Sequence, residues 1–284
     1  MRWPWAGRAY TMHSLDQLPL IAIFFGALLL QVLAIEIGFR IGNARFSKQN
    51  KPQMAQVRAI MGASLGLLAF MLAFSFSIAQ QHFEERTRAY MMEVSAIDSA
   101  YRGADLIQSQ AREAAQDLLR DFAKLRIETT AVARENNIDA VVKLVRESEQ
   151  LHDRLWSIAE SSMEGEGGGE SSSIFASSVL AMIDAHDARL QSAFFNRIPP
   201  VIWFTLFLMA LLSMVITGYQ AGLTGTRSRL ATWTLALTFS VVMALVTDLD
   251  RPNMTLFKVN QQLMVELENR MEGGFGWDPE VHKR

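Results

Sequence analysis

The fold is decided by residues 58–105, which read RAIMGASLGLLAFMLAFSFSIAQQHFEERTRAYMMEVSAIDSAYRGAD. From Ala59 to Gln81 this stretch has no charged residue, and at about 1.5 Å per residue such a helix crosses roughly 30 Å of bilayer hydrocarbon. From His82 onwards the helical periodicity persists, but charged residues become frequent and no Pro or Gly-rich break intervenes. We therefore predict a membrane helix that continues into a water-facing helical domain.

The composition of the whole chain excludes several classes of function. Half of the 284 residues are hydrophobic and 20% are charged, in separate runs, and the net charge of −2 gives no electrostatic reason to expect a nucleic-acid partner. Cysteine is absent, so disulfides, thiolate metal sites and thiol nucleophiles are excluded.

Three further apolar stretches predict membrane helices, over residues 18–39, 198–219 and 230–247. Gly218, Gly222 and Gly225 indicate a turn after the third of these helices. The expected fold is an all-α membrane protein that has four transmembrane helices and an extramembrane antiparallel helical bundle between the second and third. Its expected parts are an N-terminal segment (1–16), transmembrane helices 1 and 2 (17–81), a four-helix bundle (82–197), transmembrane helices 3 and 4 (198–250), and an amphipathic helix with a tail (251–284).

The number of helices in the bundle follows from the direction of the chain. One seam of apolar residues includes Ala115, Leu118, Phe122 and Leu125 and favours an unbroken helix from 82 to 134, which would leave three legs. The chain must return to the membrane, however, and an even number of legs is then required. We predict four legs, with a break near Gln108–Ser109 and Ser109 as the capping residue. The C-terminal amphipathic helix is expected over 255–272, with Leu256, Val259, Leu263 and Leu267 on its apolar face.

The second membrane helix has two features of interest. Gly62, Gly66, Ala69 and Ala73 form a stripe of small residues along which another helix can pack closely. Phe70, Phe74 and Phe76 are candidates for a hydrophobic constriction in a pore, and lipid contact or core packing is their commoner role.

Charged residues gather at the predicted membrane boundary on the bundle side. They are Glu84, Glu85, Arg86, Arg197, Asp248, Asp250 and Arg251. The carboxylates are a candidate ion or metal interface. A ring of ion pairs with the arginines is the favoured interpretation, because pairing is the usual way to hold charge near lipid. At the other end of the first span, Glu36 and Arg40 are expected to pair across one helical turn.

The histidines and the catalytic motifs give little indication of chemistry. His186 lies on an apolar seam and His152 lies near another, where a buried, hydrogen-bonded histidine is the usual case and a metal-binding or pH-sensing pair is the alternative. No phosphate-binding loop, zinc-protease motif or nucleophile elbow occurs. We therefore expect a protein that is not an enzyme.

The side of the membrane on which the bundle lies stays open. The two short loops that face away from the bundle are rich in basic residues: Arg40, Arg45, Lys48, Lys51, Arg58, Arg227 and Arg229. By the positive-inside rule they favour an external bundle. The difference disappears when the basic residues at the two ends of the bundle are counted.

Four blocks in order resemble a known family. They are EIGFRIG (36–42), GASLGLLAFMLAFSFS (62–77), RIPPVIW (197–203) and DLDRP (248–252). The chain is identified by them as a member of the bestrophin-like family of bacterial membrane proteins, a domain of unknown function, over nearly all of 15–270.

The resemblance implies a distant similarity to bestrophins, which are oligomeric, calcium-activated anion channels with four membrane segments per subunit. By position, the second span would then line the pore with Gly66, Phe70, Phe74 and Ser77, and Asp248 and Asp250 would stand at the calcium-binding cluster. It also implies an inner-membrane homo-oligomer in a lipid bilayer, with no cofactor other than calcium.

Two functions are consistent with these observations. The first is an oligomeric anion (chloride) channel. The second is a non-conducting sensor or scaffold whose bundle binds a ligand or a protein partner. They differ in whether the second span is covered from lipid on all sides when the protein assembles.

Overall fold

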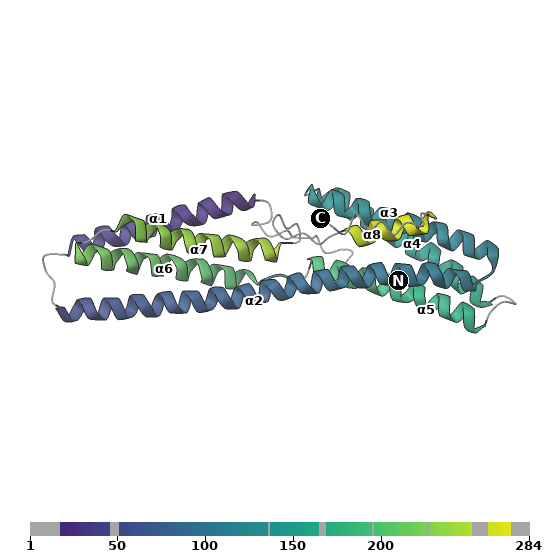
Figure 1. Cartoon of the computed structure of the whole chain (residues 1–284), viewed down its shortest axis with the longest axis horizontal. Coiled ribbons are helices and arrows are strands. Elements are labelled where there is room, and N and C mark those ends of the chain that lie inside the picture. Colours follow the sequence, from purple (N-terminus) through teal and green to yellow (C-terminus); the bar gives the residue numbers. More distant parts are fainter. Residues whose placement is uncertain are drawn as a thin grey trace. The chain divides into compact units, whose positions relative to one another are not determined.

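The computed structural model describes residues 18–45, 51–135, 137–164, 169–194, 196–225, 228–251 and 261–273. Within these ranges the chain is helical and has no strand (Figure 1). The helices are α1 (Leu20–Asn43), α2 (Lys51–Gly103), the short 3-10 helix η2 (Ala104–Leu106), α3 (Ser109–Arg134), α4 (Ile138–Glu164), α5 (Glu170–Phe194), α6 (Pro200–Thr224), α7 (Arg229–Asp250) and α8 (Gln262–Met271).

The chain divides into two compact units. The first, here called the membrane unit, comprises Met1–Phe83 and Asn196–Phe257, and the second, here called the helical bundle, comprises Glu84–Phe195 and Lys258–Arg284. Helix α2 contributes its first part to the membrane unit and its second part to the bundle. Helices α1, α2, α6 and α7 are each long and apolar enough to cross a membrane. The predicted all-α membrane fold is therefore confirmed.

In the membrane unit, α1 and α6 pack in parallel with their backbones in contact. A Cβ added to Gly38 would lie 2.0 Å from the carbonyl oxygen of Val215, and one added to Gly218 would lie 2.0 Å from that of Ile35. Gly42 and Gly222 are equally enclosed. The prediction of a turn at Gly218 and Gly222 is thus wrong, because both lie inside α6, which ends at Gly225 in the left-handed conformation (φ 67°).

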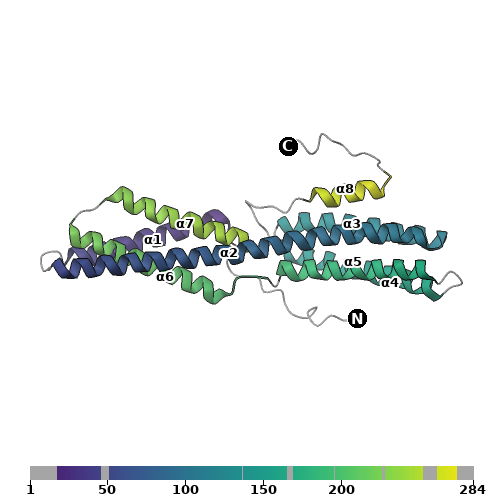
Figure 2. The ribbon, with the colours of Figure 1, turned by 60° about the horizontal axis from the view of Figure 1, so that its bottom comes forward.

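The other two spans are attached by side chains. Gln31 of α1 donates a hydrogen bond from Nε2 to Ser240 Oγ of α7 (3.1 Å). Helix α2 packs through Leu68 and Leu72 against the apolar cluster of α6 and α7, which contains Leu206 and Met243. Figure 2 shows the first part of α2 running beside α6.

The helical bundle has one apolar core. It is built from the second part of α2 with α3, α4, α5 and α8, and its largest buried side chains are Ile97, Leu119, Phe122, Leu155, Phe175, Met182 and Met264. The predicted break near Gln108–Ser109 is present, since η2 ends at Leu106 and α3 begins at Ser109. Ser109 is the first helical residue and not the cap; Gln108 holds the cap position without a side-chain hydrogen bond.

Helix α8 completes this core from the C-terminal part of the chain. Its buried residues are Met264, Leu267 and Met271, whereas Leu263 is 43% exposed. The predicted apolar face is therefore wrong at Leu263, and Leu256 and Val259 lie outside the described residues. Both ends of α8 are held by hydrogen bonds: the Met264 N–H donates to Tyr90 Oη (3.0 Å), and Arg120 Nε donates to the Met271 carbonyl (2.8 Å).

Candidate functional site

One face of α2 in the membrane unit is left uncovered by the chain itself. The predicted pore-lining residues Gly66, Phe70, Phe74 and Ser77 all lie on this face, where Phe70 is 66% and Phe74 52% exposed. The buried residues of the same span are Leu68, Leu72, Ser75 and Ala79. At about 100° per residue, these two sets point in opposite directions.

The predicted packing stripe lies on the same uncovered face. Gly62, Gly66, Ala69 and Ala73 are exposed, and no other atom comes within 4 Å of a Cβ added to either glycine. Among the described residues, no helix of the same chain packs on this stripe. Phe76 differs from the other two phenylalanines, because it packs against the buried cluster that contains Trp203.

The acidic residues at the end of α7 are occupied by internal contacts. The buried Asp250 accepts a hydrogen bond at Oδ1 from the Ile198 N–H (2.9 Å), and His82 Nδ1 lies 3.7 Å from the same oxygen. Arg197 donates to the carbonyl oxygen of Asp250. The arginine thus contacts the backbone of Asp250 and not its carboxylate, and these contacts hold Asp250 against the start of α6. His82 was not among the residues singled out by sequence, although it begins the charged part of α2.

The four carboxylates proposed as an ion or metal interface are divided between the two units. Asp248 and Asp250 are buried in the membrane unit, whereas Glu84, exposed, and Glu85, half-buried, belong to the bundle. Among the described residues there is no group of three or more His, Asp or Glu side chains that could hold a metal ion. The predicted pair of Glu36 and Arg40 is confirmed, with 3.0 Å between Oε1 and Nε.

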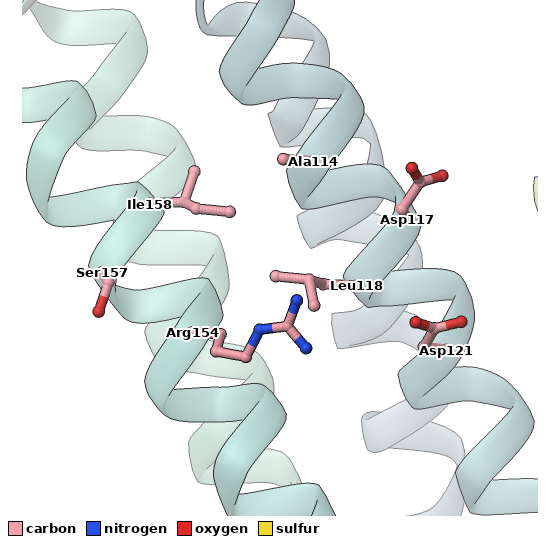
Figure 3. Close-up of a pocket in the computed structure, with 7 residues that line it drawn as sticks. All are labelled: Ala114, Asp117, Leu118, Asp121, Arg154, Ser157 and Ile158. Carbon is pink, nitrogen blue, oxygen red and sulfur yellow. The ribbon is translucent and has the colours of Figure 1, made fainter.

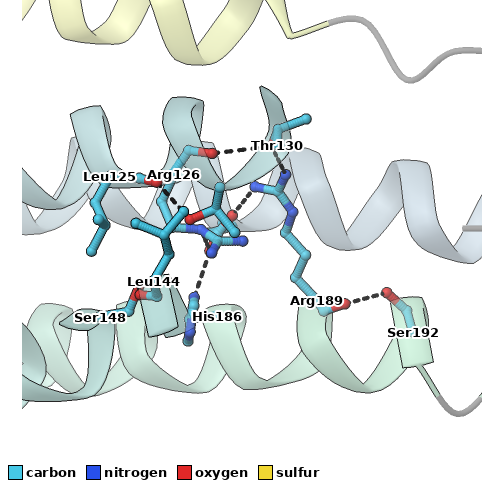
Figure 4. A network of polar contacts seen from close by, with 10 residues as sticks. Leu125, Arg126, Thr130, Leu144, Ser148, His186, Arg189 and Ser192 are labelled. Atoms are coloured by element: carbon cyan, nitrogen blue, oxygen red, sulfur yellow. Dashed lines mark hydrogen bonds and ion pairs between the residues drawn. The ribbon is translucent and has the colours of Figure 1, made fainter. Parts of the chain in front are cut away.

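A layer of charged and titratable side chains crosses the core of the helical bundle. We call it the buried polar layer, and its members are Glu93, Arg126, His152, His186 and Arg189. Each of the helices α2, α3, α4 and α5 contributes at least one of them. Figure 4 shows Arg126, His186 and Arg189 converging between the helices.

Glu93 is the centre of this layer and has no exposed surface. Its Oε1 lies 3.0 Å from Arg126 Nε and 2.9 Å from His186 Nδ1, and its Oε2 pairs with Arg189. Arg189 also donates to Thr130 Oγ1 (3.1 Å) and stacks over the Tyr90 ring at 5.0 Å. Glu93 is therefore the anion that joins α3 and α5 to α2.

The electrostatics of the layer favour an ionised carboxylate and neutral imidazoles. Burial alone would raise the pKa of Glu93, but Arg126 and Arg189 hold that pKa well below its usual range. Burial lowers the pKa of Arg126 to about 10, which leaves the guanidinium charged at neutral pH. Burial also lowers the pKa of His186, with Arg126 adding to the effect, and lowers the pKa of His152 to about 3.

Sequence reasoning found part of this layer. His186 is buried and hydrogen-bonded, as expected, whereas Glu93, Arg126 and Arg189 were missed. The predicted seam of α3 passed through Leu125, but the structure buries Arg126 in the core and leaves Leu125 half-buried. The signal was available in the spacing of Ala115, Leu119, Phe122, Arg126 and Thr129, which places the arginine on the buried stripe.

A shallow hollow lies on the bundle surface between α3 and α4. It is lined by Asp117, Asp121 and Arg154 together with Leu118, Ser157 and Ile158 (Figure 3). Its three charged side chains stand in solvent. This hollow therefore has none of the enclosed polar groups that a specific small-molecule site uses.

Comparison with protein families gives a match over most of the chain. A family model described as the Bestrophin-like domain matches residues 20–262, from the first residue of α1 to the first residue of α8. No curated protein and no solved structure matches the chain. Because the matched range covers the helices of the membrane unit and nearly all those of the bundle, the chain belongs to the bestrophin-like family.

Proposed function

We propose that this protein is an oligomeric anion channel of the cell's inner membrane, in which the uncovered face of α2 lines the shared pathway. The observation that carries the proposal is the small contact of α2 with its own chain. Only 17% of its apolar window is buried, against 33% for α6 and for α7. A span with an uncovered face of this kind gives several copies of the chain a common surface around one axis.

The residues on this face suit a narrow hydrophobic pathway. Phe70 and Phe74 would supply bulky rings one helical turn apart, and Gly66 and Ser77 would leave room on either side of them. Rings of apolar side chains control the hydration of a pore, and thereby its conduction. Ala59 to Gln81 contains no acidic side chain that would repel an anion.

Selectivity for anions is supported by charge at one end of α2. Arg58 is exposed just before the span, and about two turns earlier α2 begins at Lys51, where the unpaired N–H groups of its first turn carry partial positive charge. Both would raise the local concentration of anions at that mouth. The basic residues of the same loop favour the cytoplasmic side for this end of α2 and an external bundle, by the positive-inside rule.

Planar bilayers with a chloride gradient test the proposal. Purified wild type should conduct, and Phe74→Ala should change the conductance. Phe25→Ala is the matched control, because Phe25 is equally exposed but lies on α1. Wild-type protein that is folded but gives no current above background would overturn the channel proposal.

The absence of cysteine allows a second test of which face lines the pathway. A charged, water-soluble thiol reagent should react with Ser77→Cys and block the current, because only water-exposed thiols ionise readily. Ala79→Cys, on the buried face of the same helix, should be unaffected. Equal reaction at both positions would contradict the assignment of this face to the pathway.

A non-conducting sensor or scaffold is the second candidate. The observation in its favour is that α2 runs unbroken from Lys51 to Gly103 and carries Glu93 of the buried polar layer. A ligand that altered the layer would then act on the same helix that crosses the membrane. Spin labels placed at Ser77→Cys should report such a ligand in protein that carries no current.

Reporter fusions after Arg45 and in the loop between α4 and α5 would settle the orientation of the protein.

A further inference from the structure

The two histidines of the buried polar layer lie where protonation of the imidazole is unfavourable. His152 is 7% and His186 1% exposed, and their rings meet at 4.8 Å between centroids. The Phe122 ring lies against both, at 4.9 Å from His152 and 5.5 Å from His186. An imidazolium at either position would lose most of its hydration.

The charges around these rings already include more cations than anions, which disfavours a further positive charge. Glu93 on α2 is the single carboxylate of the layer, and Arg126 on α3 and Arg189 on α5 both pair with it. A proton added to either imidazole therefore creates a third cation beside one anion. The Nε2 atoms of His152 and His186 have no hydrogen-bond partner among the described residues, so each is an available site for that proton.

We propose that the buried polar layer is an acid-sensitive switch, in which proton uptake at His152 and His186 opens α4 and α5 away from α2 and α3. In the closed bundle the two imidazoles are neutral, and His186 donates its Nδ1–H to Glu93. In the open bundle both rings reach water and bind protons with the affinity of an ordinary histidine. Acid thus stabilises the open form.

The other ionisable groups near the rings set the size of the effect. Tyr90 on α2 stays neutral, because burial raises its pKa. Asp187 on α5 acts in the opposite sense: burial, with Asp184 and Glu149 nearby, raises its pKa to about 6, so the closed form also binds a proton as the pH falls. Asp187 therefore opposes the two histidines.

The sign and magnitude follow from proton linkage. Two histidines that titrate with the ordinary pKa of 6.5 only in the open form raise the opening equilibrium about 100-fold between about pH 7.5 and pH 5.5. Proton uptake by Asp187 in the closed form reduces this about fourfold, to about 25-fold. At about pH 5.5 Glu93 contributes little, because an ordinary glutamate is still ionised in the open form.

Amide hydrogen exchange of the full chain in lipid nanodiscs tests the proposal. After division by the intrinsic exchange rates, peptides from α4 and α5 should show opening about 25-fold more frequent at about pH 5.5 than at pH 7.5. Peptides from α1, which carries no histidine, serve as the reference within the same molecule. If exchange in α4 and α5 changes with pH no more than exchange in α1, the proposal is overturned. The wild-type protein is sufficient for this test.

Three variants separate the histidines from other sources of pH dependence. His152→Gln/His186→Gln removes both proton sites but keeps an N–H donor for Glu93, and the response should reverse to about fourfold less opening in acid, owing to Asp187 alone. Asp187→Asn should increase the wild-type response to about 100-fold. His82→Gln, a histidine of the membrane unit, is the matched control and should behave as wild type. An unchanged response in the double variant, or in Asp187→Asn, would contradict the assignment of the switch to this layer.

Discussion

The membrane unit and the helical bundle are assembled from helices of similar length by different physical means. In the membrane unit, α1 and α6 touch through Gly38, Gly42, Gly218 and Gly222, where backbone lies against backbone. In the bundle, large apolar side chains fill the space between helices, and a charged layer crosses the core. Lipid gives helices no hydrophobic reason to associate, so close van der Waals contact replaces it, whereas water drives the bundle together and makes the charged layer costly.

The largest expected effect is on the glycine contact. Gly38→Leu should prevent α1 and α6 from packing, because even its Cβ would lie 2.0 Å from a backbone oxygen. We expect a loss of more than about 4 kcal/mol in stability, measured by unfolding in detergent. Gly26→Leu on the same helix is the control, since nothing lies within 4 Å of its Cβ. Equal stability of the two variants would show that the α1–α6 contact is not needed.

The next effect is on the buried charge. Glu93→Gln leaves Arg126 and Arg189 without their anion in a dry core and should cost about 3–5 kcal/mol, measured by denaturant unfolding of the bundle. Glu36→Gln removes a carboxylate from an ion pair whose Arg40 is exposed and should cost less than about 1 kcal/mol. A mild effect at Glu93 would mean that water reaches the layer.

A smaller effect is expected where α8 joins the bundle. Leu267→Ala removes a fully buried side chain and should cost about 2–4 kcal/mol in the same unfolding experiment. Leu263→Ala, on the exposed side of α8, should stay within about 0.5 kcal/mol of wild type. Similar losses at the two positions would contradict the packing of α8 on the bundle core.

The smallest effect is on a polar contact within the membrane unit. Gln31→Leu removes the hydrogen bond to Ser240 and should cost about 0.6 kcal/mol, the average for such bonds between membrane helices. Thermal unfolding in nanodiscs would detect it against Gln56→Leu, whose side chain is exposed on α2. A loss several times larger would make polar contacts as important in this unit as the glycine contact.

The sequence was sufficient to predict where the helices lie along the chain, but not which helices pack against each other. The uncharged run of Ala59–Gln81 and the charges after it predict α2 correctly, because length and hydropathy act locally. Gly218 and Gly222 were interpreted as a turn, since nothing within α6 reveals that the backbone of α1 lies against them. Glycine lowers the stability of a helix in water, whereas in lipid it allows two helices to pack closely.

The buried polar layer illustrates the same limit. Leu125 and Arg126 are adjacent, and a shift of one residue in the assumed seam decides which of them faces the core. An apolar residue is the natural choice until a buried carboxylate from another helix is known to meet the arginine. Glu93 and Arg126 are 33 positions apart in the chain, so no local pattern links them.

The position of α8 determines when the bundle is completed during synthesis. Met264, Leu267 and Met271 belong to the same core as Phe122 and Phe175, so this core is complete only after residue 271 has left the ribosome. By then all four membrane spans have already been translated, and the first of them have had time to enter the lipid. Until that moment the nascent bundle exposes the apolar surface that α8 will cover. Translation of α8 ends the period in which this surface can aggregate or bind chaperones.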